Sequence, residues 1–278
     1  MQTFIEILKA VLLGIIEGIT EWLPISSTGH MILVDEFLHL QVSEEFKEMF
    51  FVVIQLGAIL AVPILFWDKL VPFSRKKTRE EKNSIWRLWA RVIVGVLPAA
   101  VLGLLLDDFF DEHFYNFIVV AIALIVYGVA FIVVERMKRG AAYRIESVYD
   151  IGFKDALIIG SFQVLSLIPG TSRSGSTILG GMLTGVSRTA ASEFSFFMAI
   201  PVMLGASLLK VAKFALEGFT PTSTEIWLLL VGIAVSFIVS VVVIKFLMSF
   251  VRRHDFIPFG IYRILLGAVL IGYYIFAK

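Results

Sequence analysis

The chain lacks cysteine and holds few charged residues. None of its 278 residues is cysteine, which excludes disulfides, thiolate metal sites and a cysteine nucleophile. Charged residues make up 17% of the sequence and apolar residues 58%, against about 25% and about 45–50% in soluble domains. The formal net charge of +1 gives no sign of a nucleic-acid partner. With a mean hydropathy of +0.90, residues 1–278 are expected to form one all-α polytopic membrane domain.

Six apolar segments approach the roughly 20 residues that cross a bilayer. They cover 47–67, 92–106 with its flanks, 115–134, 194–216, 226–248 and 257–277. Two other apolar regions, 4–40 and 153–186, are interrupted by PISSTGH (24–30) and PGTSRSGST (169–177). Irregular backbone at membrane depth is tolerated only inside protein or beside a wet cavity. We therefore predict two re-entrant helical hairpins beside six transmembrane helices; ordinary spans with a short polar loop are the alternative.

Charge in the connecting segments predicts the orientation. Basic residues gather at 69–91, at 136–144 and at 252–253, whereas the turns at 107–112 and 217–225 are acidic. The positive-inside rule places the three basic segments in the cytoplasm. Six spans and two hairpins satisfy this rule, and both termini then lie outside.

The two halves of the chain repeat one pattern. Each reads hairpin, span, span, span, with repeat 1 at about 1–140 and repeat 2 at about 150–278. The first half begins outside and the second inside, so the repeat has inverted topology, as in many transporters. At a constant offset of 146, five residues of the first hairpin have counterparts in the second: Gly14, Glu17, Ser26, Thr28 and Gly29 correspond to Gly160, Gln163, Ser172, Ser174 and Gly175.

The first break carries the residues best suited to chemistry. Glu17 and Glu21 lie four apart on one helix face, where two carboxylates could hold Mg²⁺ or Ca²⁺. Ser27 and His30 lie one turn apart at the start of the next half-helix. One interpretation has Ser27 attack phosphorus while His30 moves the proton; another has His30 attack directly. Glu21 could alternatively activate Ser27 as a base.

The hydroxyl groups around both breaks point to an anion. Helix N-termini bind phosphate, and an arginine fork suits it. Arg173 is the basic residue of the second break, and the alternative is an ion pair of Arg173 with a glutamate that joins the hairpins. We predict catalytic roles for Ser27, His30, Glu21 and Arg173. The predicted substrate-binding residues are Ser26, Thr28, Ser172, Ser174, Gly175 and Ser176; the predicted metal ligands are Glu17 and Glu21.

Three tracts carry a specific resemblance. EGITEWLPISSTGHMILV (17–34), PGTSRSGSTILGGMLTGVSRTAASEFSFFMAIP (169–201) and IPFGIYR (257–263) resemble the undecaprenyl-pyrophosphate phosphatases of the bacitracin-resistance type. The resemblance covers essentially the whole chain. It implies hydrolysis of undecaprenyl pyrophosphate to undecaprenyl phosphate and inorganic phosphate, which recycles the carrier lipid for peptidoglycan synthesis and confers bacitracin resistance. It also implies a need for Mg²⁺ or Ca²⁺ and a multi-pass location in the bacterial cytoplasmic membrane, with the active site towards the outer, periplasmic face.

The resemblance assigns the motifs residue by residue. The family's glutamate-rich motif falls on Glu17 and Glu21, its nucleophile motif on Ser27 and His30, and its PGxSRS motif on residues 169–174. The partners it implies are the polyprenyl pyrophosphate lipid and the membrane lipids.

Two questions stay open at the level of sequence. An inverted repeat with broken helices is also transporter architecture, so a flippase of undecaprenyl phosphate on the same scaffold is the alternative function. Gly175, Gly180 and Gly181 allow close helix packing either within the fold or between protomers, so a homodimer remains an alternative to a monomer.

Overall fold

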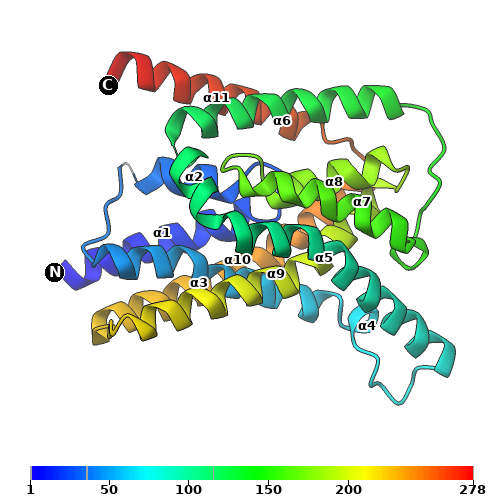
Figure 1. The fold of residues 1–278 in the computed structure, drawn as a ribbon, viewed down its shortest axis with the longest axis horizontal. Coiled ribbons are helices and arrows are strands. Elements are labelled where there is room, and N and C mark those ends of the chain that lie inside the picture. The colour runs from blue at the N-terminus through cyan, green and yellow to red at the C-terminus, as the bar shows by residue number, and fades with distance from the viewer. Residues whose placement is uncertain (1, 36, 115, 278) are drawn as a thin grey trace.

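The structure is a computed structural model that describes residues 2–35, 37–114 and 116–277, and helices dominate it (Figure 1). The first half contains α1 (Gln2–Thr20), α2 (Ser27–Asp35), α3 (Glu44–Leu65), α4 (Trp67–Leu70), α5 (Arg79–Phe114) and α6 (Phe117–Lys138). The second half contains the 3-10 turn η1 (Val148–Asp150), α7 (Phe153–Val164), the 3-10 turn η2 (Leu165–Leu167), α8 (Arg173–Leu183), α9 (Arg188–Leu216), α10 (Ser223–Val251) and α11 (Ile257–Ala277).

Within the described part of the chain, six helices are long and apolar enough to cross a membrane. They are α3, α5 as far as Leu106, α6, α9, α10 and α11, and they confirm the six predicted spans. The pieces on either side of the two breaks are shorter. The 9 residues of α2 and the 11 of α8 rise about 14 and about 17 Å, half of a bilayer core.

Part of the basic connecting segment 69–91 is helical in the structure. Residues 79–91 belong to the predicted cytoplasmic linker, but α5 already begins at Arg79. The Thr78 hydroxyl accepts a bond from the Glu81 N–H at 3.2 Å, and the Glu81 carboxylate accepts one from the Thr78 N–H at 2.6 Å. This reciprocal capping box starts the helix about four turns before its apolar part.

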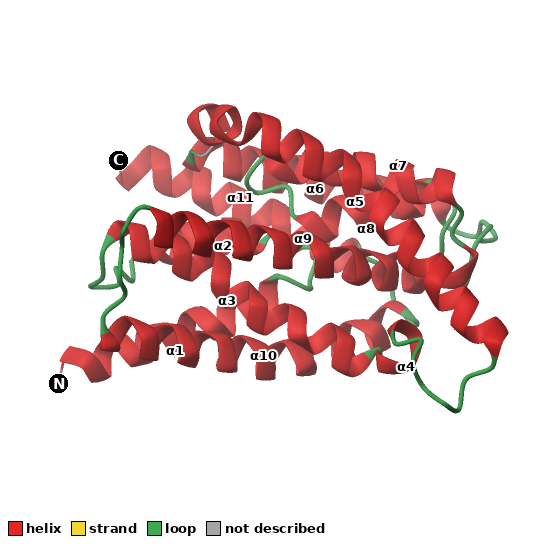
Figure 2. Cartoon of the chain, turned by 60° about the horizontal axis from the view of Figure 1, so that its bottom comes forward, coloured by secondary structure: helices red, strands yellow, loops and turns green. Residues whose placement is uncertain are grey.

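The helices form paired layers around the two breaks. α10 packs against both α1 and α3, α5 against α7, and α6 against α11 (Figure 1). In the turned view, α2 and α8 run through the middle of the bundle, between α10 and α6 (Figure 2). Both termini lie at one end of the molecule, and the loops that follow α4 and α6 lie at the other.

Glycines permit the closest of these contacts. A Cβ atom on Gly57 would stand 2.1 Å from the carbonyl oxygen of Ile233, and one on Gly160 would stand 1.9 Å from that of Gly95. Such distances require backbones in direct contact, as expected where helices associate through van der Waals packing. Gly180 and Gly181 also face neighbours in the same chain, Phe162 and Ala191. The small-residue surface of α8 is thus used within the fold.

Candidate active site

Two serines with the same unusual backbone conformation begin the inner half-helices. Ser26 has φ +75° and Ser172 has φ +73°, in the left-handed region that residues other than glycine seldom adopt. The Ser26 hydroxyl accepts a bond from the Gly29 N–H at 3.2 Å, and Ser172 accepts one from the Gly175 N–H at 3.1 Å. Each serine therefore caps a helix N-terminus at a cost in backbone strain of about 1–3 kcal/mol, a pattern concentrated at functional sites.

The two breaks lie side by side although about 150 residues separate them in sequence. Arg173 donates from Nη2 to Oε1 of Glu21 at 2.7 Å. The Ser174 hydroxyl donates to the backbone carbonyl of Glu21 at 3.2 Å. The predicted meeting of Arg173 with a glutamate of the first break is thus present in the structure.

Glu21 joins this arginine to Ser27. The Ser27 hydroxyl donates to Oε2 of Glu21 at 2.6 Å, so the two carboxylate oxygens receive one donor each. Both Glu21 and Ser27 are buried. Arg173 is itself fixed by the carbonyl of Ser195 at 2.9 Å and by the Trp22 ring, whose centroid lies 5.8 Å from the guanidinium carbon. A serine that donates to a fixed carboxylate has the arrangement that nucleophilic catalysis requires, with a base within hydrogen-bond reach of the hydroxyl.

His30 has other partners than Ser27. Its Nδ1 lies 2.7 Å from the carbonyl of Ser26 and its Nε2 lies 2.7 Å from the Tyr262 hydroxyl. Because a carbonyl only accepts, Nδ1 carries a proton, and Nε2 is the nitrogen open to exchange. The hydrogen bond of Ser27 therefore favours Glu21 over His30 as the group that receives the serine proton.

The remaining predicted hydroxyls divide into two groups. Thr28 lines a cavity together with Glu17. Ser172 and Ser174 bond to one another at 3.1 Å near Glu21, whereas Ser176 is fully buried and donates to the Tyr127 hydroxyl at 3.1 Å. Ser176 is thus turned towards α6 and supports the second break.

Glu17 is the carboxylate that fits a bound cation. It is 0% exposed, and neither of its carboxylate oxygens has a hydrogen-bond partner in the described residues. No cluster of three or more acidic or histidine ligands occurs in that part of the chain. Mg²⁺ binds through one or two carboxylates together with water and substrate phosphates, and Glu21 keeps further lone pairs beside its two bonds. The Glu17 and Glu21 pair therefore fits a hard divalent cation.

Arg263 is a central residue to which the sequence assigned no role. It is 0% exposed, and its guanidinium donates to the carbonyls of Pro24 at 3.0 Å, Gly170 at 2.7 Å and Thr171 at 3.0 Å. No carboxylate of the described residues pairs with it. An arginine inside an apolar span was the signal that could have revealed it. It ties the first break to the second.

Other buried carboxylates serve structure at the end opposite the termini. Lys69 contacts both oxygens of Glu193 at 2.7 Å, so Glu193 lies in an ion pair away from Ser27. Arg188 holds Glu135 through two nitrogens, and Glu135 also accepts the N–H of Phe256 at 2.8 Å, one residue before α11.

Fold and site together define a polytopic, all-helical membrane protein in which a serine, a glutamate and an arginine from two broken helices meet at a buried site. A family model described as "Bacitracin resistance protein BacA" matches residues 10–269, and the chain belongs to that family.

The relatives of the chain share one description. It is 58% identical to an undecaprenyl-diphosphatase of Enterococcus faecalis (strain ATCC 700802 / V583) over 274 residues, 99% of each chain. It is 55% identical to the undecaprenyl-diphosphatase of Acetivibrio thermocellus over 271 residues, 98% of each chain. A third, from Streptococcus mutans serotype c, is 55% identical over 97% of this chain and 96% of its own length.

Proposed function

We propose that the protein is an undecaprenyl-diphosphatase, a membrane hydrolase that cleaves the phosphoanhydride of undecaprenyl diphosphate and confers bacitracin resistance. The observation that carries the proposal is the contact of Ser27 and Arg173 with the two oxygens of Glu21, at 2.6 and 2.7 Å. It occurs in a chain that is 55–58% identical, over nearly its full length, to proteins of that description.

The chemistry proposed for this site begins with Ser27. Its Oγ bonds to the terminal phosphorus, the bond from that phosphorus to the bridging oxygen breaks, and undecaprenyl phosphate leaves with that oxygen. The hydroxyl proton passes to Glu21, which returns it to solvent before the second step. Water then attacks the phosphorus of the phosphoserine and its proton passes to Glu21. The bond from Ser27 Oγ to phosphorus breaks, Glu21 gives the proton to this oxygen, and inorganic phosphate is released. Such reactions depend mainly on positioning and on stabilisation of charge.

The other residues stabilise and position the phosphate. Arg173 carries a fixed positive charge beside the nucleophile, and the N-termini of α2 and α8 add free N–H groups. His30, whose exchangeable nitrogen is Nε2, is proposed as a further acid–base group; the alternative is His30 as nucleophile. Glu17 and Glu21 would hold the Mg²⁺ or Ca²⁺, which, when bound, neutralises the developing phosphate charge.

The topology proposed for the chain is an inverted repeat with two re-entrant hairpins. Ser26 and Ser172 share their φ angle and cap, as described above. Gly14 packs on the Gly232 carbonyl, and its counterpart Gly160 packs on that of Gly95. These paired contacts of α1 with α10 and of α7 with α5 support a two-fold relation between the halves.

An outward-facing active site completes the proposal. The basic loops after α4 and α6 lie opposite both termini (Figure 1), and the positive-inside rule assigns them to the cytoplasm. The cavity that reaches Glu17 is lined by Asp35, His39 and Glu44 from the opposite end. Hydrolysis would therefore occur towards the periplasmic face of the cytoplasmic membrane.

The test is release of inorganic phosphate from undecaprenyl diphosphate by purified protein in detergent. Wild type, Ser27→Ala and Arg173→Ala are compared with and without EDTA, and Ser161→Ala on the exposed side of α7 is the matched control. We expect release by wild type and by the control, and loss in both site variants and with EDTA. No release by well-folded wild type would refute the proposal.

Transport of undecaprenyl phosphate is the second candidate, supported by the paired glycine contacts of the two halves. A lipid-flip assay in sealed vesicles with Ser27→Ala separates it from hydrolysis. If this variant folds and moves no lipid, no separate transport function remains.

A further inference from the structure

A cavity runs from the acidic end of the bundle towards Glu17. Its volume is about 740 Å³, and residues of α1, α2 and α3 line it. On α3 it extends from Glu44 to Gln55, 11 residues or about 16 Å along the helix. On α2 its wall is Thr28, Met31, Ile32 and Asp35, which share one helix face at spacings of three and four residues.

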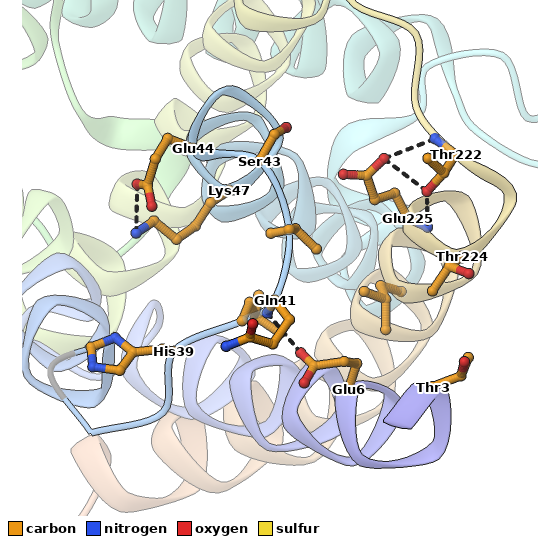
Figure 3. Close-up of a pocket in the computed structure, with 13 residues that line it drawn as sticks. Thr3, Glu6, His39, Gln41, Ser43, Glu44, Lys47, Thr222, Thr224 and Glu225 are labelled. Carbon is orange, nitrogen blue, oxygen red and sulfur yellow. Dashed lines mark hydrogen bonds and ion pairs between the residues drawn. The ribbon is translucent and has the colours of Figure 1, made fainter. Parts of the chain in front are cut away.

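A second hollow of about 730 Å³ adjoins this cavity and widens it towards the ends of α1 and α10. The two share His39, Glu44 and Lys47 as lining residues. Figure 3 shows these three on one side of the hollow, with Glu6 and Glu225 across from them. The joint space, termed here the vestibule, thus leads from the surface inwards beside α2.

Acidic side chains dominate the vestibule. Its described lining contains six carboxylates, Glu6, Glu17, Asp35, Glu44, Glu48 and Glu225, against one lysine. That lysine, Lys47, is bound to Glu44 at 2.7 Å and Asp35 at 3.3 Å, and two lysines outside the lining pair with two further carboxylates, Lys9 with Glu6 and Lys210 with Glu48, both at 2.8 Å. Six carboxylates thus meet three lysines, which leaves the vestibule negative, and Glu17 and Glu225 have no ion pair in the described residues. A concave surface of one charge sign raises the local concentration of the opposite ion and repels its own sign. A pyrophosphate headgroup or a phosphate product is therefore disfavoured here, and a cation is favoured.

The inner end supplies an independent reason to expect a cation. Glu17 closes the vestibule there and is fully buried, with both carboxylate oxygens free of partners in the described residues. A desolvated carboxylate without a donor is costly unless a cation or a proton neutralises it. The acidic mouth and the unpartnered carboxylate thus point to one class of ligand.

The α2 helix separates this space from the other side of the site. His30 is not among the residues that line the vestibule; its Nε2 lies 2.7 Å from the hydroxyl of Tyr262 of α11, a residue that is 42% exposed. The partner of His30 therefore reaches the protein surface on the α11 side, while Thr28 faces the vestibule.

We propose that the vestibule is a cation-selective entrance through which a divalent cation reaches Glu17, separate from the α11 side of the site on which Tyr262 reaches the surface. The net negative charge of the lining attracts the cation, and the unpartnered carboxylate of Glu17 receives it at the inner end. Lys47 joins Asp35 and Glu44 across the mouth. The inference rests on the proposed function only in assigning this cation to the phosphatase site.

Thiol chemistry tests the entrance directly, because the chain has no native cysteine. Gln55→Cys places one thiol deep in the vestibule, and purified protein is treated with a cationic or an anionic water-soluble thiosulfonate. We expect the ratio of the labelling rate with the cationic reagent to that with the anionic reagent to be about tenfold or more higher for Gln55→Cys than for free cysteine. Ser74→Cys, beside Arg75 and Lys76, is the matched control and should favour the anionic reagent. Equal or anion-favoured labelling of Gln55→Cys would overturn the proposal.

Binding of Mn²⁺, followed by electron paramagnetic resonance, gives a readout that does not use activity. Gln55→Cys labelled with the cationic reagent should bind Mn²⁺ at least about tenfold more slowly than the unlabelled variant. The rate of Mn²⁺ binding by wild type treated with that reagent should not change. Mn²⁺ binding at an unchanged rate would contradict the entrance. If Gln55→Cys does not fold, Phe51→Cys, one turn nearer the mouth on α3, replaces it without removing a carboxylate. Because neither readout involves phosphate release, failure of the entrance and failure of the phosphatase are told apart.

Discussion

Glu21→Gln is the substitution that tests the proposed base most sharply. Glutamine has the shape of glutamate but only one oxygen, and Glu21 accepts hydrogen bonds at both oxygens, from Ser27 at 2.6 Å and from Arg173 at 2.7 Å. The amide NH₂ group must therefore face one of these two donors. Either the serine or the arginine then loses its acceptor, and in both orientations the arginine loses its counter-ion.

The magnitude follows from the role of each contact. Loss of a general base lowers the rate by about 10²- to 10⁴-fold, which corresponds to about 3–5 kcal/mol in the barrier. Removal of one partner of a buried ion pair also destabilises the fold by about 3–5 kcal/mol, although the Ser195 carbonyl still holds Arg173. Thermal unfolding in detergent must accompany the assay, so that kcat is expressed per folded molecule.

The assay is phosphate release from undecaprenyl diphosphate, measured over a range of Mg²⁺ concentrations up to saturation. Glu17→Gln is the control, and Gln163 at the matching position of the second half indicates that an amide can be buried there. We expect Glu17→Gln to raise the Mg²⁺ requirement by at least about tenfold and to recover with added Mg²⁺, whereas Glu21→Gln does not recover. A kcat of folded Glu21→Gln within threefold of wild type would refute Glu21 as the base.

Three further predictions concern positioning and packing. Arg263→Lys cannot reach the carbonyls of both breaks at once, so we expect lower kcat and lower thermal stability; wild-type kcat in this variant would show that the bridge is dispensable. Tyr262→Phe removes the hydroxyl from His30 and should reduce kcat/KM about three- to tenfold, and an unchanged value would remove this bond from the mechanism. Gly160→Ala forces a Cβ to 1.9 Å from the Gly95 carbonyl and should destabilise the fold by about 2 kcal/mol or more, measured by thermal unfolding. Gly205→Ala, whose Cβ meets nothing within 4 Å, is its control, and equal stability of the two variants would contradict the packing argument.

The elements that could be predicted from sequence depend on local properties. Apolar length is enough to locate six spans, and proline, glycine and serine are enough to locate the breaks at 24–30 and 169–177. The early start of α5 shows the limit of the hydropathy criterion. The Thr78–Glu81 capping box is itself visible in the sequence, but a charged helix beyond a membrane span leaves no apolar signal.

The partners within the site could not be predicted in the same way. Ser27 and His30 are three residues apart, which suggests a pair on a helix, but Ser27 bonds to Glu21 across the non-helical turn at 21–25. Arg263 reaches Pro24 across 239 residues, and that contact follows from the packing of α11 against α6. Long-range contacts of this kind depend on the tertiary arrangement, whereas spacing reports only neighbours along one helix.

The most direct test of the central claim is to trap the phosphoenzyme. Purified protein is mixed with undecaprenyl diphosphate labelled in its terminal phosphate, quenched within one turnover, and the labelled peptide is sequenced by mass spectrometry. We predict phosphoserine at Ser27, no label in Ser27→Ala, and label that persists longer in Glu21→Gln. Phosphohistidine at His30, or turnover by Ser27→Ala at the wild-type rate, would contradict the assignment of Ser27 as the nucleophile.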